Sequence, residues 1–115
     1  MNQLFLDQIT VDSSNAEYYA KRVQSTVSLA SRFDGLDLSD VSSMQLYTSE
    51  VNFHLKEEAK ASRLPHKLAQ HFGVKFVKKQ SYDKSSLTYT GIIDDDGNGR
   101  GITIMVRSNC RSKAN

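Results

Sequence analysis

LTYTGIIDDDGNGRGITIMV, residues 87–106, carries the clearest structural signal in the chain. Two runs rich in β-branched and aromatic residues, 87–93 and 102–106, flank a segment made almost entirely of turn-forming residues. Asp-Gly and Asn-Gly pairs tolerate positive φ, and between apolar runs they are strong hairpin signals. The stretch therefore predicts a C-terminal hairpin of two long antiparallel strands.

The residues before this hairpin predict a short helix followed by a further strand. Helix-favouring residues begin at Lys56, and a helical piece over 65–72 is compatible with Pro65, because proline is tolerated in a first helical turn. Gly73 is expected to end this helix. Residues 74–79 then alternate as a strand does, which places Lys75, Val77 and Lys79 on one face and Phe76 and Lys78 on the other.

Residues 43–56 are compatible with two structures. Met44-Leu46 and Val51-Phe53-Leu55 alternate as strands do, whereas Met44, Tyr47, Val51 and Leu55 are also spaced as on a helix. The alternation favours a hairpin with its turn near 48–50.

A capping box, Ser14-Asn15-Ala16-Glu17, marks the start of a predicted N-terminal helix. Apolar residues then recur at helical spacing up to Ala30, and Gly35 is typical of a helix C-terminus. The pattern predicts an amphipathic helix over 14–33. The apolar residues between Leu4 and Val11 predict a strand or a short apolar lead-in.

Together these segments predict an α+β fold. One long N-terminal amphipathic helix is expected to pack on a small antiparallel sheet, with one or two short helices before the C-terminal hairpin. The chain has 115 residues and a mass of 12.9 kDa, which is enough to bury about two-thirds of its surface. We expect a single domain over 1–108 and a frayed tail over 109–115.

The formal net charge of +2 hides a strong asymmetry along the chain. Residues 1–55 hold three basic and seven acidic side chains, whereas residues 56–115 hold twelve basic and six acidic ones. Such asymmetry is a hint of a polyanionic partner, although two halves that neutralise each other across a surface are also compatible with it.

The basic half contains the candidate binding residues. Lysine and arginine can neutralise phosphates, and an exposed tyrosine can stack on a base. The candidates are Arg63, Lys67, Lys75, Lys78, Lys79, Tyr82, Lys84, Arg100 and Arg107.

No metal or other cofactor is expected. Residues 94–99 match the D-x-D-x-N-G opening of an EF-hand loop, but Met105 stands where the twelfth-position Glu is required, which favours a plain hairpin turn over a weak cation site. His66 and His71 are five residues apart, so a helix would not bring them to one zinc ion.

The sequence contains no nucleophile elbow, P-loop or dinucleotide-binding glycine pattern. The interpretation we favour is a non-catalytic small binding protein that docks on a protein or nucleoprotein partner, as an accessory or inhibitor of the kind found in phages and mobile elements. One alternative is a nucleic-acid-binding domain using residues 56–115. A lesser alternative is a small hydrolase or nuclease using His66, His71 or the Asp-rich loop.

The chain is expected to be intracellular and cytoplasmic. A single cysteine, Cys110, excludes an internal disulfide, which is typical of proteins in reducing compartments. No apolar run is long enough to span a membrane, and the first residues lack the pattern of a signal peptide.

Overall fold

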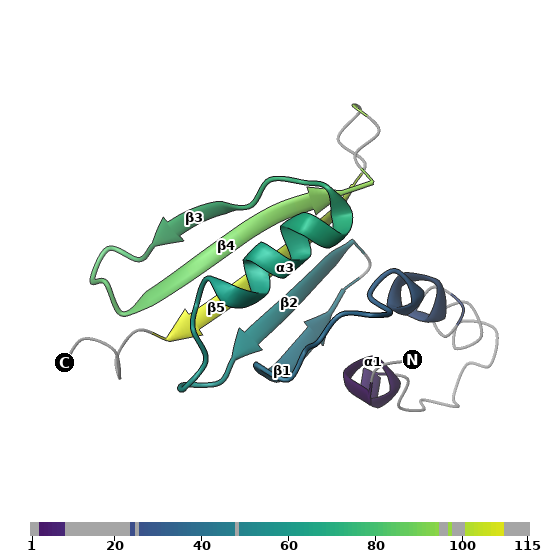
Figure 1. Ribbon diagram of the computed structural model, residues 1–115, viewed down its shortest axis with the longest axis horizontal. Helices are drawn as coiled ribbons and strands as arrows, with labels where there is room; N and C mark the ends of the chain where they lie inside the picture. Colours follow the sequence, from purple (N-terminus) through teal and green to yellow (C-terminus); the bar gives the residue numbers. More distant parts are fainter. Residues whose placement is uncertain are drawn as a thin grey trace. The chain divides into compact units, whose positions relative to one another are not determined.

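A computed structural model of the chain describes residues 3–8, 24, 26–47, 49–94, 97 and 101–109. The chain forms two compact units, Met1–Leu36 and Asp37–Asn115. The second unit holds a five-stranded sheet and a helix (Figure 1). The elements are α1 (Gln3–Gln8), β1 (Val41–Leu46), β2 (Glu50–Leu55), α3 (Arg63–Phe72), β3 (Val77–Gln80), β4 (Ser86–Ile93) and β5 (Ile102–Asn109).

The first unit contains short helical segments. A strand or a short apolar lead-in was predicted between Leu4 and Val11, and helix α1 occupies part of this stretch, so the strand alternative is wrong. A short apolar run does not distinguish a strand from a helix by periodicity. Residues 26–31 are helical, and the chain leaves this helix through a turn in which Gly35 has φ +88°. The buried rings of Phe5 and Phe33 lie 5.2 Å apart, centroid to centroid.

The prediction of a long N-terminal helix on the sheet is wrong. Residues 14–23, with the capping box, lie outside the described residues, and the described helical residues of this region are 24 and 26–31. Serine and threonine are modest helix formers. Ser31 illustrates the reason, because its hydroxyl donates to the carbonyl of Ser28 at 2.8 Å.

The sheet is mixed rather than antiparallel, with strand order β1-β2-β5-β4-β3. Hairpins β1–β2 and β4–β5 are antiparallel, as predicted, and β3 pairs antiparallel with β4. The two hairpins meet through β2 and β5, which run parallel, with Phe53 aligned to Val106. This parallel pairing shows that the predicted all-antiparallel sheet is wrong. Local turn signals define each hairpin, but they do not show which strands pair when two hairpins meet.

The ambiguous region 43–56 forms the hairpin that its alternation favoured. Strand β2 buries Val51, Phe53 and Leu55, so the period of two describes this segment. Strand β1 carries an irregularity in its pairing between Val41 and Ser43.

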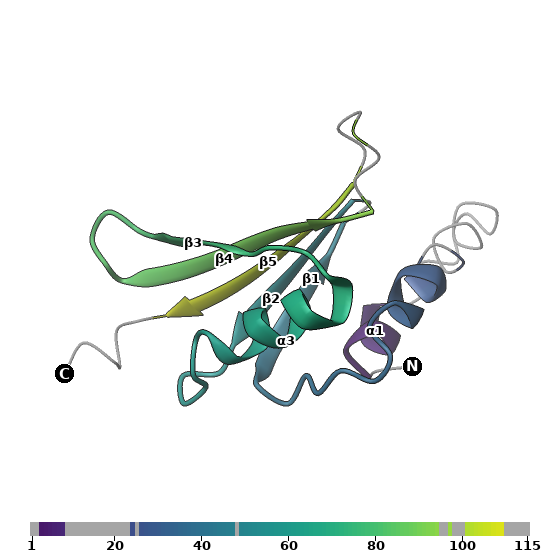
Figure 2. The ribbon, with the colours of Figure 1, turned by 45° about the horizontal axis from the view of Figure 1, so that its top comes forward.

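Helix α3 lies on one side of the sheet (Figure 2) and buries Leu64, Pro65 and Leu68. Pro65 lies in its first turn, and Gly73 ends it with φ +66°, as predicted. The helical tendency from Lys56 is not realised, because residues 56–62 form turns, with the amide of Ala59 donating to the carbonyl of Lys56 at 3.1 Å.

The core of the second unit lies between α3 and the sheet. Four side chains of β2 and β5, Val51, Phe53, Ile104 and Val106, are fully inaccessible to solvent. Burial of such a side chain contributes about 1.5–3 kcal/mol. No helix in the described part of the chain has the length and apolar character needed to cross a bilayer.

Candidate binding face

Alternation along the strands gives the sheet two different faces. The side chains aligned with Phe53 and Val106 lie on the face that α3 covers. The opposite face, which we call the open face, carries mainly polar side chains, and no described element of the second unit lies over it. Its central members are Ser43, His54, Asn52, Thr103, Met105, Arg107, Ser86, Thr88, Thr90, Val77 and Lys79.

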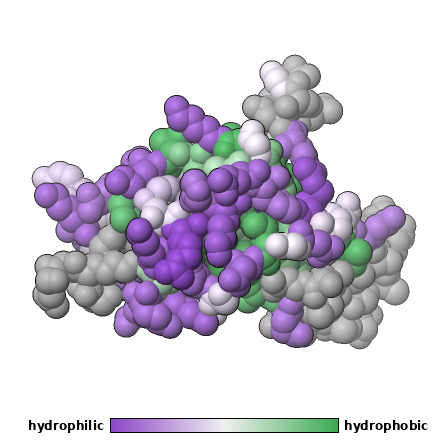
Figure 3. All heavy atoms as spheres, in the orientation of Figure 1, coloured by the Kyte–Doolittle hydropathy of each residue, from purple (hydrophilic) through white to green (hydrophobic). Residues whose placement is uncertain are grey.

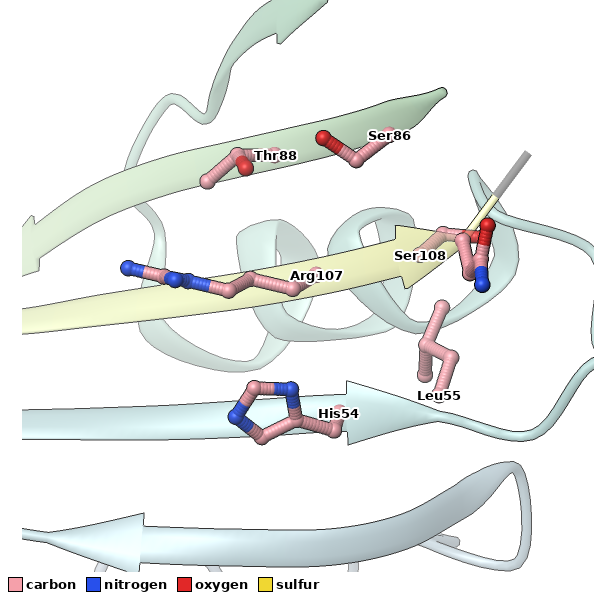
Figure 4. A pocket seen from close by; sticks show the side chains of 7 residues that line it. His54, Leu55, Ser86, Thr88, Arg107 and Ser108 are labelled. Carbon is pink, nitrogen blue, oxygen red and sulfur yellow. The ribbon is translucent and has the colours of Figure 1, made fainter. Parts of the chain in front are cut away.

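The register of the sheet brings one line of polar residues together across all five strands of the open face. Each strand pairing aligns one member with the next. We call this line the open-face row; in strand order it consists of Ser43, His54, Arg107, Thr88 and Lys79. Figure 4 shows His54, Arg107 and Thr88 on the side of the sheet away from α3.

The open-face row borders a shallow hollow at the end of β5. His54, Ser86, Thr88, Arg107 and Asn109 line it, so its walls supply an imidazole, a guanidinium and hydroxyl and amide groups (Figure 4). Within the described part of the chain Arg107 forms no ion pair, and its Nη2 contacts the sulfur of Met105 at 4.0 Å. The guanidinium therefore keeps donors for an external acceptor.

The rows on either side of the open-face row contain no acidic residue among the described positions. The row toward the Asp-rich loop holds Asn52, Met105 and Thr90, and the row on the other side holds Ser86 and Asn109. Among the described strand residues of this face, the nearest acidic one in register is Glu50, one row further on, where its carboxylate accepts a hydrogen bond from Asn52 Nδ2 at 3.0 Å. This end of the open face is therefore positively charged.

An ordered turn follows Gln80, the last residue of β3, and presents Tyr82, whose side chain is fully exposed. Asp83 orders the turn, because its Oδ1 accepts hydrogen bonds from Ser85 Oγ at 2.6 Å, the Ser85 amide at 3.0 Å and Ser81 Oγ at 2.8 Å. These bonds, those from Ser85 first, lower the pKa of Asp83 to about 2. Lys84 completes the turn with φ +59°.

The nine candidate binding residues do not form one patch. Lys79 and Arg107 lie together in the open-face row, and Tyr82 and Lys84 lie in the turn beyond it. Lys78 belongs to the α3 face, because it aligns with Tyr89 and through it with Val106. Arg63 and Lys67 lie on α3, and Lys75 lies between α3 and β3. Arg100 lies outside the described residues.

The two cations of α3 already have acidic partners. Arg63 Nη1 lies 3.3 Å from Asp40 Oδ1, and Lys67 Nζ lies 3.7 Å from Asp37 Oδ2. Hydrogen bonds from Ser39, with a smaller contribution from Lys67, lower the pKa of Asp37. Although the α3 side in Figure 3 is also largely hydrophilic, these pairs make its charge more balanced than that of the open-face row.

The histidines do not converge. His66 and His71 are exposed on α3, where His71 makes an edge contact with the ring of Phe72, whereas His54 lies on the opposite side of the sheet. Among the described residues, no three histidine, cysteine or acidic side chains gather as metal ligands would. The Asp-rich loop is described only at Asp94 and Gly97, both with positive φ, and its other residues lie outside the described part.

His54, Thr88 and Ser86 are site residues that the sequence patterns missed. The alternation in β2 already separates His54 from Phe53 and Leu55, so its exposure on the other face could have been inferred. The alignment of His54 with Arg107 could not have been inferred, because this alignment depends on the parallel pairing of β2 with β5.

Comparison with protein-family models finds no match for this chain, and searches of curated proteins and of solved structures find none either.

Proposed function

We propose that this chain is a non-catalytic small binding protein of the accessory or inhibitor type, which docks on a protein or nucleoprotein partner through the open face. The observation that supports this proposal is the open-face row, a line of polar and basic side chains that crosses all five strands.

The sheet suits this role because its two faces have different chemistry. The α3 face holds the apolar side chains of the core, so substitutions there change stability. On the open face, side chains project from paired strands whose backbone is already ordered, so docking there requires little further ordering of the chain.

The proposal is tested by comparing loss of cations from the open face with loss of a cation from the α3 face. Lys79→Gln, combined with Arg107→Gln, removes both strong cations of the open-face row, whereas Lys78→Gln removes a neighbouring exposed cation from the other face. Tagged versions of the three proteins are used to recover partners from a lysate of the source cells, with and without nuclease treatment.

We expect the wild-type and Lys78→Gln proteins to recover the same partner and the double variant to lose it. Equal recovery by all three proteins, or no partner with the wild type, contradicts docking through the open face. The nuclease arm distinguishes a direct protein contact from one that needs nucleic acid.

A further inference from the structure

We propose that the open face binds single-stranded nucleic acid, with Arg107 and Lys79 on separate backbone phosphates and Tyr82 stacked against a base. This inference rests on the proposed function in one respect, namely that the open face is the docking surface. It goes further by committing to the chemistry of the partner.

The first argument is charge complementarity. Arg107 offers a planar set of donors that fits a phosphate, and Lys79 offers a point charge. Thr88, between them, adds a hydroxyl donor, and His54 flanks Arg107 on β2. No acidic residue lies in the open-face row or in the described rows beside it. The carboxylate of Asp83, in the adjoining turn, accepts hydrogen bonds from Ser81 and Ser85, and Lys84 follows it in the chain.

The second argument is the spacing of the cations. Arg107 on β5 and Lys79 on β3 are separated by the intervening strand β4, so their backbones lie about 10 Å apart at ordinary strand spacing. A strand of nucleic acid carries a phosphate at each sugar, so it can place separate phosphates at the two cations, whereas a free phosphate offers a single centre of charge.

The third argument is the position of Tyr82. Its ring is fully exposed in the turn that begins just after β3, at the end of the sheet that carries the open-face row. The hydrogen bonds to Asp83 order this turn, so the ring is presented by an ordered support. An aromatic platform beside cations is typical of single-strand binding, because only unstacked bases expose their faces to a side chain.

Fluorescence anisotropy with a labelled oligo-dT and a labelled oligo-U, each of about 16 nucleotides, measures the binding directly. We expect binding to both by the full chain that weakens as salt rises, because phosphate contacts release counterions. An unlabelled duplex of the same length is expected to compete poorly.

Three substitutions test the residues named. Arg107→Gln and Lys79→Gln are each expected to weaken binding about tenfold and to reduce the salt slope by about 0.7, the value for one phosphate of a single strand. Tyr82→Ala is expected to weaken binding roughly tenfold, whereas Tyr82→Phe keeps the stacking surface and the affinity. Lys78→Gln, the matched control on the other face, is expected to leave Kd within about twofold.

The inference is overturned if the chain binds neither oligonucleotide at low salt, if the duplex competes as well as the single strand, or if Lys78→Gln weakens binding as much as Lys79→Gln. Failure of this inference can be distinguished from failure of the proposed function by the partner-recovery experiment. If no oligonucleotide binds but a nuclease-resistant partner is lost from the Lys79→Gln/Arg107→Gln double variant, the open face docks a protein. If that partner is also unaffected, both proposals are wrong.

Discussion

The ring of Phe76 occupies the space that a side chain on Gly91 would need, since a Cβ built on Gly91 would lie 2.7 Å from Phe76 Cε1. Gly91 lies in β4 beside Ile104 of the core strand β5. Gly91→Ala should therefore displace the ring and destabilise the fold by about 1–3 kcal/mol, measured by urea unfolding. In a Phe76→Ala background the same change should cost almost nothing, and equal costs in both backgrounds would show that the ring is not the obstacle.

Ile92 and Ile93 are neighbours in β4 with opposite environments, the first 48% exposed and the second 1%. Ile93→Ala removes a core side chain and should lower the free energy of unfolding by about 2–5 kcal/mol. Ile92→Ala on the open face should cost less than about 1 kcal/mol. Thermal or urea unfolding of the two variants compares them directly, and similar losses would mean that the two faces are assigned wrongly.

Asp83 should titrate well below an ordinary aspartate. Its folded pKa of about 2 is below the ordinary value of 3.8 because Ser85 and Ser81 donate to the ionised carboxylate. A lowered folded pKa means that the stabilisation by Asp83 is present above pH 4 or so and is lost as the pH falls through about 2. The carboxyl carbon shift followed by NMR against pH gives the midpoint.

Ser85→Ala removes the hydroxyl that donates to Asp83 at 2.6 Å, so it should move this midpoint upward toward 3.8. Ser39→Ala, which removes a donor to Asp37 in a different part of the unit, is the control and should leave Asp83 unchanged. A midpoint near 3.8 in the wild type would contradict the ordered turn and, with it, the support proposed for Tyr82.

Asn52 is buried on the open face at 4% exposure, and among the described residues its Oδ1 has no hydrogen-bond partner. An unsatisfied buried acceptor costs about 1–3 kcal/mol. Asn52→Val removes it and should be neutral or stabilise the fold by about 1 kcal/mol, although the bond from Nδ2 to Glu50 is lost. Asn52→Asp instead buries a charge beside Glu50 and should cost at least about 2 kcal/mol. Urea unfolding tests both, and a large loss for Asn52→Val would show that Oδ1 is satisfied.

The parts of the fold that the sequence predicted depend on local chemistry. The Asp-Gly and Asn-Gly pairs, the alternation of Val51, Phe53 and Leu55, and Gly73 each act within a few residues, and the two hairpins and the end of α3 follow from them. The long N-terminal helix was wrong because helical spacing shows which side of a helix is apolar but not how far the helix extends.

The candidate site was only partly predictable for a related reason. The alternation of residues 75–79 correctly placed Lys79 and Lys78 on opposite faces. The pattern of charges along the chain, however, grouped Lys79 with Arg63 and Lys67, which the fold places on α3 beside acidic partners. Only the parallel register of β2 and β5 brings His54 beside Arg107, and no local signal encodes that register.

An NMR titration of the ¹⁵N-labelled chain with oligo-dT measures most directly which face the ligand contacts. We expect the shift changes to concentrate on the open-face row, at the amides of His54, Thr88 and Arg107 and at the side-chain Nε of Arg107, while the amides of Leu64 and Leu68 on α3 stay unchanged. Changes concentrated on α3, or no changes at saturating oligonucleotide, would contradict binding of single-stranded nucleic acid by the open face.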